Sequence, residues 1–451
     1  THQDMQSLVA QHKESLSSDD ERYFKRSFAI QNQRMAQFGL MPKVHKKSSP
    51  TASRPLVKCA GSKVETMSKY LDVQLQRVVH LCPSYIKDSS SLLRILEQLP
   101  QLPPGSKLLS ADAVSMYTNI DTQHGVASLT KWLHRHKRKL PPDFNIPLVT
   151  EALSIVMQQN VFQFDDTFWL QTSGTAMGTS TACVYATIYY SLHEETRLLP
   201  TYHSNGGPLL FYKRFIDDTI IIWTPKIPFA PLESFLQDLP FGKLTFTADP
   251  PSDSVNFLDL TLSISDGTIT SKTFVKEHNL HLYLPPTSAH APGVLKSLIF
   301  GNLQRYWKQN SHAADYTKIA SDFRHHLLAR GHSPGVIDPI FMEAASHIDQ
   351  ASATSKKLAC RFTPKLFLHW EFHPKDIPRR QIRSIFNRTC SQVLSSARTL
   401  TGKKPELGHL TIAYSKPKNL GDVLCRSKMT EPPGERVSDI LRALPTAPPS
   451  P

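Results

Sequence analysis

The sequence predicts an α+β fold, because strand-like and helical stretches alternate along its first 275 residues and helices dominate afterwards. Short apolar runs bounded by turn residues mark the strands, at 107–114, 161–170, 211–223, 244–247 and 256–264. Stretches with helical periodicity separate them, at 64–100, 122–160 and 231–239. Three later helices are predicted. The first covers 291–309, the second ends at Arg330 with Gly331 as its C-terminal cap, and the third covers 336–350.

The remaining segments are defined by composition. Residues 1–35 are polar and predict a helical arm. Residues 41–64 hold six Lys or Arg and no Asp or Glu, together with three prolines, so loop and short strand are expected there. A basic segment at 365–398 precedes a short apolar strand at 410–414. The Pro-rich tail, 428–451, is expected to be disordered.

Length and charge narrow the class of protein. The 451 residues suffice for two to four domains. The net charge of +14 favours a polyanionic partner, nucleic acid first, although an ordinary basic enzyme is the alternative. No cysteine pair has Cys-x-x-Cys spacing, so neither a zinc knuckle nor a disulfide framework is indicated, and a reducing compartment fits. No run of 18 apolar residues occurs, so no membrane partner is expected.

A pair of adjacent carboxylates, Asp217 and Asp218, interrupts an apolar run. Burying acids is costly without a compensating partner, and carboxylates are usual Mg²⁺ ligands. Asp112 ends another apolar run and is the candidate third ligand, although alone it reads as a helix cap. Together they predict a two-ion site that activates a hydroxyl and stabilises charge on phosphorus. A second pair, Asp165-Asp166, fills a hairpin turn, and turn chemistry explains it.

Two further segments flank these acids. Gly174 and Gly178 lie four residues apart in a loop between the acids, where they let backbone approach a substrate closely; a plain turn is the alternative. Lys43, Lys46 and Arg54 lie in the basic segment and are suited to clamping a triphosphate; a solvated loop is the alternative.

The order of these elements resembles that of reverse transcriptases, and more closely that of Penelope-like retroelement reverse transcriptases. The resemblance covers roughly 36–427, nearly the whole chain. The matching segments are 42–46, 112–120, 162–178, 215–218, 256–260 and 416–420 with Leu424 after it, together with Leu282-Tyr283, Ser288, His290 and Arg330-Gly331 in the thumb-like stretch.

The resemblance implies a right-hand polymerase fold with an antiparallel palm sheet and a helical thumb. The expected boundaries are an N-terminal arm at 1–35, fingers at 36–106, a palm at 107–274 with a fingers insertion at about 122–170, and a thumb with C-terminal extension at 275–427. Asp259, within the palm, is expected to make a structural hydrogen bond rather than to bind metal.

The resemblance also assigns roles residue by residue. Asp112 and Asp217 would be the principal metal ligands, with Asp218 a weaker one. Tyr117 falls at the steric-gate position that excludes ribonucleotides, with a core aromatic as the alternative. Met177 and Gly178 would lie under the incoming nucleotide. Phosphates would be held by Lys43, Lys46 and Arg54, and pyrophosphate would be protonated by Lys243.

A helix of the thumb carries a further group of basic residues. Lys296, Arg305 and Lys308 would follow the template–primer backbone, or form the solvated face of their helix.

The expected activity is RNA-directed DNA polymerisation with two Mg²⁺ ions, Mn²⁺ being a possible substitute. The expected partners are an RNA template, a DNA or RNA primer and dNTPs, in the nucleus. Within enzymes the alternatives are a terminal transferase or an RNA-dependent RNA polymerase, and Tyr117 argues against ribonucleotide use. The alternative from another class is a domesticated, inactive nucleic-acid-binding scaffold, which the intact carboxylates disfavour.

Overall fold

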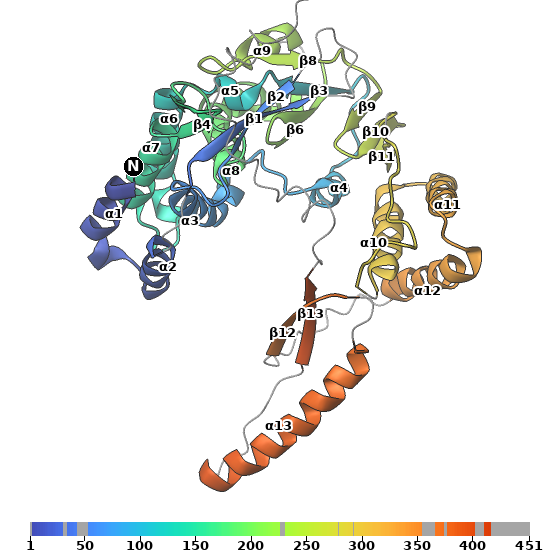
Figure 1. Cartoon of the computed structure of the whole chain (residues 1–451). Helices are drawn as coiled ribbons and strands as arrows, with labels where there is room; N and C mark the ends of the chain where they lie inside the picture. Colours follow the sequence, from blue (N-terminus) through green and yellow to red (C-terminus); the bar gives the residue numbers. More distant parts are fainter. Residues whose placement is uncertain are drawn as a thin grey trace, which may run out of the picture. The chain divides into compact units, whose positions relative to one another are not determined.

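The computed structural model describes residues 2–29, 34–42, 53–225, 231–277, 279–291, 293–353, 366–373, 377–401 and 410–415. Contacts divide the chain into two compact units, Thr1–Leu280 with Tyr306–Ile319, and His281–Arg305 with Ala320–Pro451. Sheets and helices make up the first unit, and helices dominate the second (Figure 1). The predicted α+β class is therefore confirmed. Residues 428–451, predicted to be a disordered tail, lie outside the described residues.

The central sheet of the first unit has the strand order β6-β7-β3-β8. Its strands are antiparallel: β3 (Lys107–Ala113), β6 (Leu209–Phe215), β7 (Asp218–Trp223) and β8 (Phe246–Ala248). Ile221 and Leu109 belong to the core on one face, whereas Ile220, Ile222 and Leu108 belong to the core on the other. Because both faces are covered, β7 is a continuous apolar run instead of an alternating strand.

Helices cover the first face of this sheet. They are α3 (Glu65–Gln76), α6 (Thr122–Arg135), α7 (Ile146–Gln158) and α8 (Ala182–His193), and α8 continues as a π-helix, Glu194–His203. The N-terminal helices α1 (His2–Gln11) and α2 (Ser18–Phe28) contact α7 and α3 respectively. Met5 and Phe24 are fully buried there, so the predicted helical arm is packed onto the core.

The second face is covered by α4 (Ser89–Leu96) and a three-stranded sheet. That sheet contains β9 (Ser254–Phe257), β10 (Leu260–Ser265) and β11 (Thr268–Thr273). The prediction of one strand over 256–264 is wrong, because Leu258 takes a φ of 56° and turns the chain back between Phe257 and Leu260.

A separate four-stranded sheet has the order β2-β1-β4-β5. It consists of β1 (Ala36–Pro42), β2 (Ser53–Lys58), β4 (Val161–Phe164) and β5 (Thr167–Leu170). The predicted hairpin at 161–170 is confirmed, with Asp165 at a φ of 53° in its turn.

Further helices within the described residues are α9 (Leu232–Asp238), α10 (Val294–Gln309), α11 (Ala313–Ala329) and α12 (Pro334–Ala353). Gly331 follows α11 with a φ of 93°, as a capping glycine should. The second unit also holds a parallel pair, β12 (Leu366–Glu371) and β13 (Leu410–Ser415), on which α13 (Arg379–Thr401) packs through Ile382. Within the described ranges, no helix has the length and apolar character needed to cross a bilayer.

Candidate active site

Three carboxylates meet where the two inner strands of the central sheet, β3 and β7, end. The register of β3 and β7 places Asp112 directly opposite Asp218, and the Ala113 N–H donates to the Asp217 carbonyl at 3.1 Å. One oxygen from each of Asp112, Asp217 and Asp218 lies within 4.8 Å of the others. The structure thus brings together the three residues that the sequence singled out, although Asp112 lies about a hundred positions before Asp217 and Asp218 along the chain.

Burial and nearby like charges change the pKa of one carboxylate of this cluster. Burial raises the pKa of Asp218 to about 6, and the charges of Asp217 and Asp112 act in the same direction, while Lys276 opposes them. Burial and nearby like charges disfavour the ionised form of these carboxylates, and a bound cation would favour it. Its donors are oxygen atoms, which suit a hard divalent ion such as Mg²⁺ or Mn²⁺. The residues present therefore fit the ions that the sequence predicts.

Tyr117 lies on the short helix α5 (Met116–Asn119), which follows the strand that carries Asp112. Burial raises the pKa of its phenol, contact with Cys183 adds to this, and the Asp217 charge acts in the same direction. The Tyr117 hydroxyl lies 3.3 Å from the Cys183 sulfur. Cys183, at the start of α8, carried no signal in the sequence that would have paired it with Tyr117.

The glycine loop packs against the protein backbone at both glycines. A Cβ at Gly178 would lie 2.1 Å from the Val57 carbonyl oxygen, and one at Gly174 would lie 2.8 Å from the Tyr117 carbonyl oxygen. The Val57 N–H also donates to the Met177 carbonyl at 2.7 Å. The glycines are therefore required where β2 and α5 approach the loop.

The predicted phosphate-binding residues have different surroundings. Lys43 and Lys46 lie outside the described residues. Arg54 is exposed on β2. Lys243 lies in a turn rather than in a strand, and its ammonium group pairs with Asp121 at 2.8 Å. Hydrogen bonding from Lys243 lowers the pKa of Asp121, which also accepts from the His124 N–H at the start of α6.

The basic residues of α10 are not equivalent. Lys296 pairs with Glu343 at 2.5 Å, and its ammonium lies 5.3 Å from the centre of the Phe300 ring. Arg305 donates to Asn302 at 3.0 Å. Lys308 is exposed. A nucleic-acid role for these residues stays a prediction, and Lys296 would have to leave Glu343 to perform it.

A cavity of about 570 Å³ opens beside Asp218. It is lined by Lys87, Asp88, Ser89, Phe215, Asp218, Asn256, Leu258, Asp259, Phe274 and Lys276. Asp259 makes the structural hydrogen bonds expected of it, accepting from Gln309 at 2.6 Å and from the Ser89 hydroxyl. Lys276 is the cation that the sequence reasoning missed here, because nothing in the linear pattern places it near Asp218.

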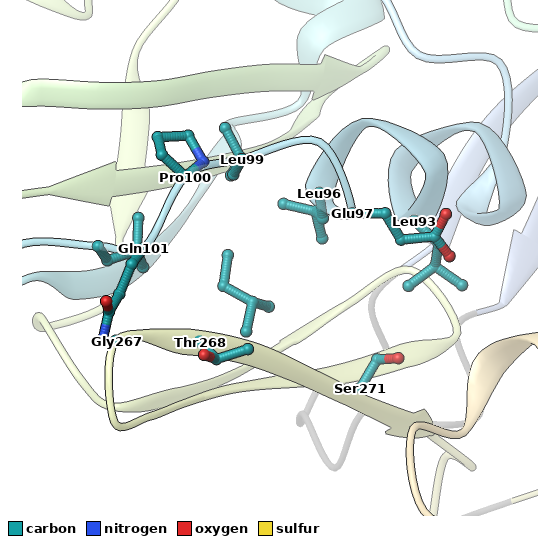
Figure 2. A pocket seen from close by; sticks show the side chains of 11 residues that line it. Leu93, Leu96, Glu97, Leu99, Pro100, Gln101, Gly267, Thr268 and Ser271 are labelled. Atoms are coloured by element: carbon teal, nitrogen blue, oxygen red, sulfur yellow. The ribbon is translucent and has the colours of Figure 1, made fainter.

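A second hollow, of about 430 Å³, lies between α4 and β11 (Figure 2). It is lined by Leu93, Leu96, Glu97, Leu99, Pro100, Gln101, Leu102, Gly267, Thr268, Ile269 and Ser271. None of the predicted site residues lines it, so it is separate from the carboxylate cluster.

Arg214 and Glu194 form a fully buried ion pair beneath the Asp217 turn, at 2.7 Å. The sequence reasoning overlooked both residues. An available signal was that Arg214 lies in a strand that is otherwise apolar apart from Lys213, where an unpaired buried charge is not tolerated.

Comparison with known proteins gives structural likenesses only. No protein-family model matches the chain, and no curated protein matches its sequence. A telomerase structure from Candida albicans in complex with a telomeric RNA fragment has a TM-score of 0.44 and 12% identity, over 76% of this chain and 59% of that one. The apo telomerase of Candida tropicalis has a TM-score of 0.42 and 12% identity, over 75% and 62%.

The RNA-dependent RNA polymerase of a human picobirnavirus has a TM-score of 0.44 and 11% identity, over 70% of this chain and 60% of that one. In each of these three matches the likeness spans less than two thirds of the other protein.

Proposed function

We propose that this chain is an RNA-directed DNA polymerase of the Penelope-like type, which extends a primer 3′-hydroxyl with deoxynucleotides. The observation that carries the proposal is the convergence of Asp112, Asp217 and Asp218 within 4.8 Å at the end of two paired strands. This constellation fits phosphoryl transfer, in which two bound cations neutralise charge at the phosphorus and activate the attacking hydroxyl.

Each neighbouring residue has a part in this proposal. Asp112 and Asp217 would hold the ions, and Asp218, whose pKa is about 6, would be the weaker ligand. The ring of Tyr117 would lie against the sugar of the incoming nucleotide and exclude a 2′-hydroxyl. Arg54, exposed on β2, would hold its phosphates. Lys243 would donate a proton to pyrophosphate after leaving Asp121.

The partners in this proposal are an RNA template, a DNA or RNA primer and dNTPs, and the place of action is the nucleus. The net charge of +14 supports a polyanionic partner.

A primer-extension assay tests the proposal. The full chain is given an annealed primer on an RNA or a DNA template, with dNTPs or NTPs, and with Mg²⁺, Mn²⁺ or EDTA. Templated extension with dNTPs on RNA, abolished by EDTA, is expected. Extension without a template would indicate a terminal transferase, and preference for NTPs an RNA polymerase. Tight hybrid binding without extension under any condition would indicate a nucleic-acid-binding scaffold.

A further inference from the structure

The turn that carries Asp217 is held in a conformation that its own sequence disfavours. Ile216 and Asp217 form the two-residue loop between Phe215 and Asp218, which pair across the strands. Ile216 has a φ of 56°. A β-branched residue with positive φ is a genuine outlier, and glycine is the usual residue at the first position of such a loop. Contacts from outside the turn must therefore stabilise it.

Arg214 provides such a contact. One terminal nitrogen of its guanidinium, Nη1, donates to the Ile216 carbonyl at 2.7 Å. The other, Nη2, donates to the Thr187 carbonyl on α8 at 2.8 Å. The Nε donates to Glu194, the first residue of the π-helix, at 2.7 Å. A single planar group thus ties the turn to α8 and to the π-helix that follows it.

The surroundings of this pair keep it charged and fixed. The side chains of Arg214 and Glu194 are 1% and 0% exposed. Glu194 also accepts from the Tyr212 hydroxyl at 3.1 Å and from the Ser84 hydroxyl at 2.5 Å. Burial lowers the pKa of Arg214, but the Glu194 charge outweighs it and the net shift is upward. Since a buried ion pair adds little stability over an apolar pair of the same size, its distinctive contribution here is geometric.

We propose that Arg214, anchored by Glu194, is a positioning residue that fixes the Ile216 turn and thereby places the Asp217 carboxylate in the metal-binding cluster. The inference rests on the proposed function for the identity of that cluster. Its consequence is a change in metal affinity, which is measured without primer extension. Outer-shell partners of metal ligands typically alter affinity by about 10–100-fold.

The test is a Mn²⁺ titration of the full chain, with free Mn²⁺ followed by its electron paramagnetic resonance signal. Arg214→Lys keeps a positive charge opposite Glu194 but lacks the fork that reaches Ile216. It is expected to raise the Mn²⁺ dissociation constant about tenfold. Arg197→Lys is the matched control, because Arg197 lies on the same π-helix and pairs with Asp238, away from the turn. The control should leave the dissociation constant unchanged.

A second pair of variants separates positioning from core packing. Glycine adopts positive φ freely, so in an Ile216→Gly background the turn no longer depends on Arg214. Adding Arg214→Lys to that background should change the dissociation constant by less than about threefold. The difference from the tenfold effect in the native background is the coupling between the two residues, of the size typical of residues in direct contact. An equal loss in both backgrounds would show that Arg214 acts by packing alone and would overturn the proposal.

Other outcomes are also decisive. Unchanged Mn²⁺ affinity for Arg214→Lys in the native background overturns the positioning role, as does a native chain that binds no Mn²⁺. If Arg214→Lys does not fold, the paired change Glu194→Gln with Arg214→Gln removes both charges together and takes its place in the same titrations. A native chain that binds Mn²⁺ but extends no primer contradicts the proposed function and leaves the positioning role standing.

Discussion

At the scale of single residues, the carboxylate cluster should lower the stability of the metal-free protein, because its charges are close together and Asp218 is partly buried. Asp218 is the clearest case, because its pKa of about 6 exceeds the ordinary value of 3.8. Folding raises the pKa of this carboxyl, so the folded state holds its proton more tightly than the unfolded state does. The contribution of the group to the free energy of unfolding is therefore complete below the unfolded-state pKa, and it is lost as the pH rises through the folded-state pKa. The metal-free protein should therefore lose stability between about pH 4 and pH 6 through this group.

Asp218→Asn should accordingly stabilise the metal-free protein at pH 8 and leave it unchanged near pH 3.5. The shift corresponds to about 3 kcal/mol, and partial solvent exposure reduces the expected gain to roughly 1–2 kcal/mol. Urea unfolding in EDTA at the two pH values measures it. An equal effect at both pH values would show that ionisation of the buried Asp218 carboxyl is not the cause.

The proposed selection of the sugar depends on a single residue, Tyr117. Tyr117→Ala should admit ribonucleotides and lower the ratio of kcat/KM for dNTP over NTP by about a hundredfold, because the ring no longer occupies the space of a 2′-hydroxyl. Tyr117→Phe is the control, since it keeps the ring and loses only the contact with Cys183. Competition between dNTP and NTP during extension measures the ratio. Unchanged selectivity for Tyr117→Ala would show that Tyr117 does not select the sugar.

At the scale of elements, the glycine loop depends on the strand packed over it. Gly178→Ala would drive a Cβ into the Val57 carbonyl at a φ of 125°, and should cost about 2–4 kcal/mol. Gly39→Ala is the control, because Gly39 lies on the neighbouring strand β1 with nothing within 4 Å of its Cβ position. Urea unfolding of both variants measures the difference. Equal stability of the two would contradict the close approach of β2.

The elements also show how far the sequence reasoning could reach. Period-two and apolar patterns located β3, β7 and the 161–170 hairpin, and register then brought Asp112 opposite Asp218. The turn at Leu258 was missed because leucine at positive φ leaves no mark in the sequence. Lys276 and Cys183 were missed because the residues that they act on, Asp218 and Tyr117, lie far away in the chain. Arg214 was overlooked although its charge in a largely apolar strand was a signal. The contact of Gly178 with the backbone of β2 was not foreseen, and the role of the glycines toward a substrate stays a prediction.

At the scale of the whole molecule, charge is the property that matters most. A net charge of +14 predicts that hybrid binding weakens steeply with salt. Four to six phosphate contacts would give a slope of roughly −4 to −5 in a plot of log affinity against log salt. Fluorescence anisotropy of a labelled RNA–DNA hybrid measures it. A slope near zero would favour the alternative of a basic enzyme with no polyanionic partner.

The central claim is that Asp112, Asp217 and Asp218 form a polymerase site, and the second Asp-Asp pair of the chain offers a built-in control. Single-turnover primer extension on an RNA template should compare Asp217→Asn with Asp165→Asn, alongside hybrid affinity for each. Asp217→Asn should slow extension by about a thousandfold, equivalent to about 4 kcal/mol, while hybrid affinity is kept. Asp165→Asn should extend like the native chain. Native-like extension by Asp217→Asn would contradict the account.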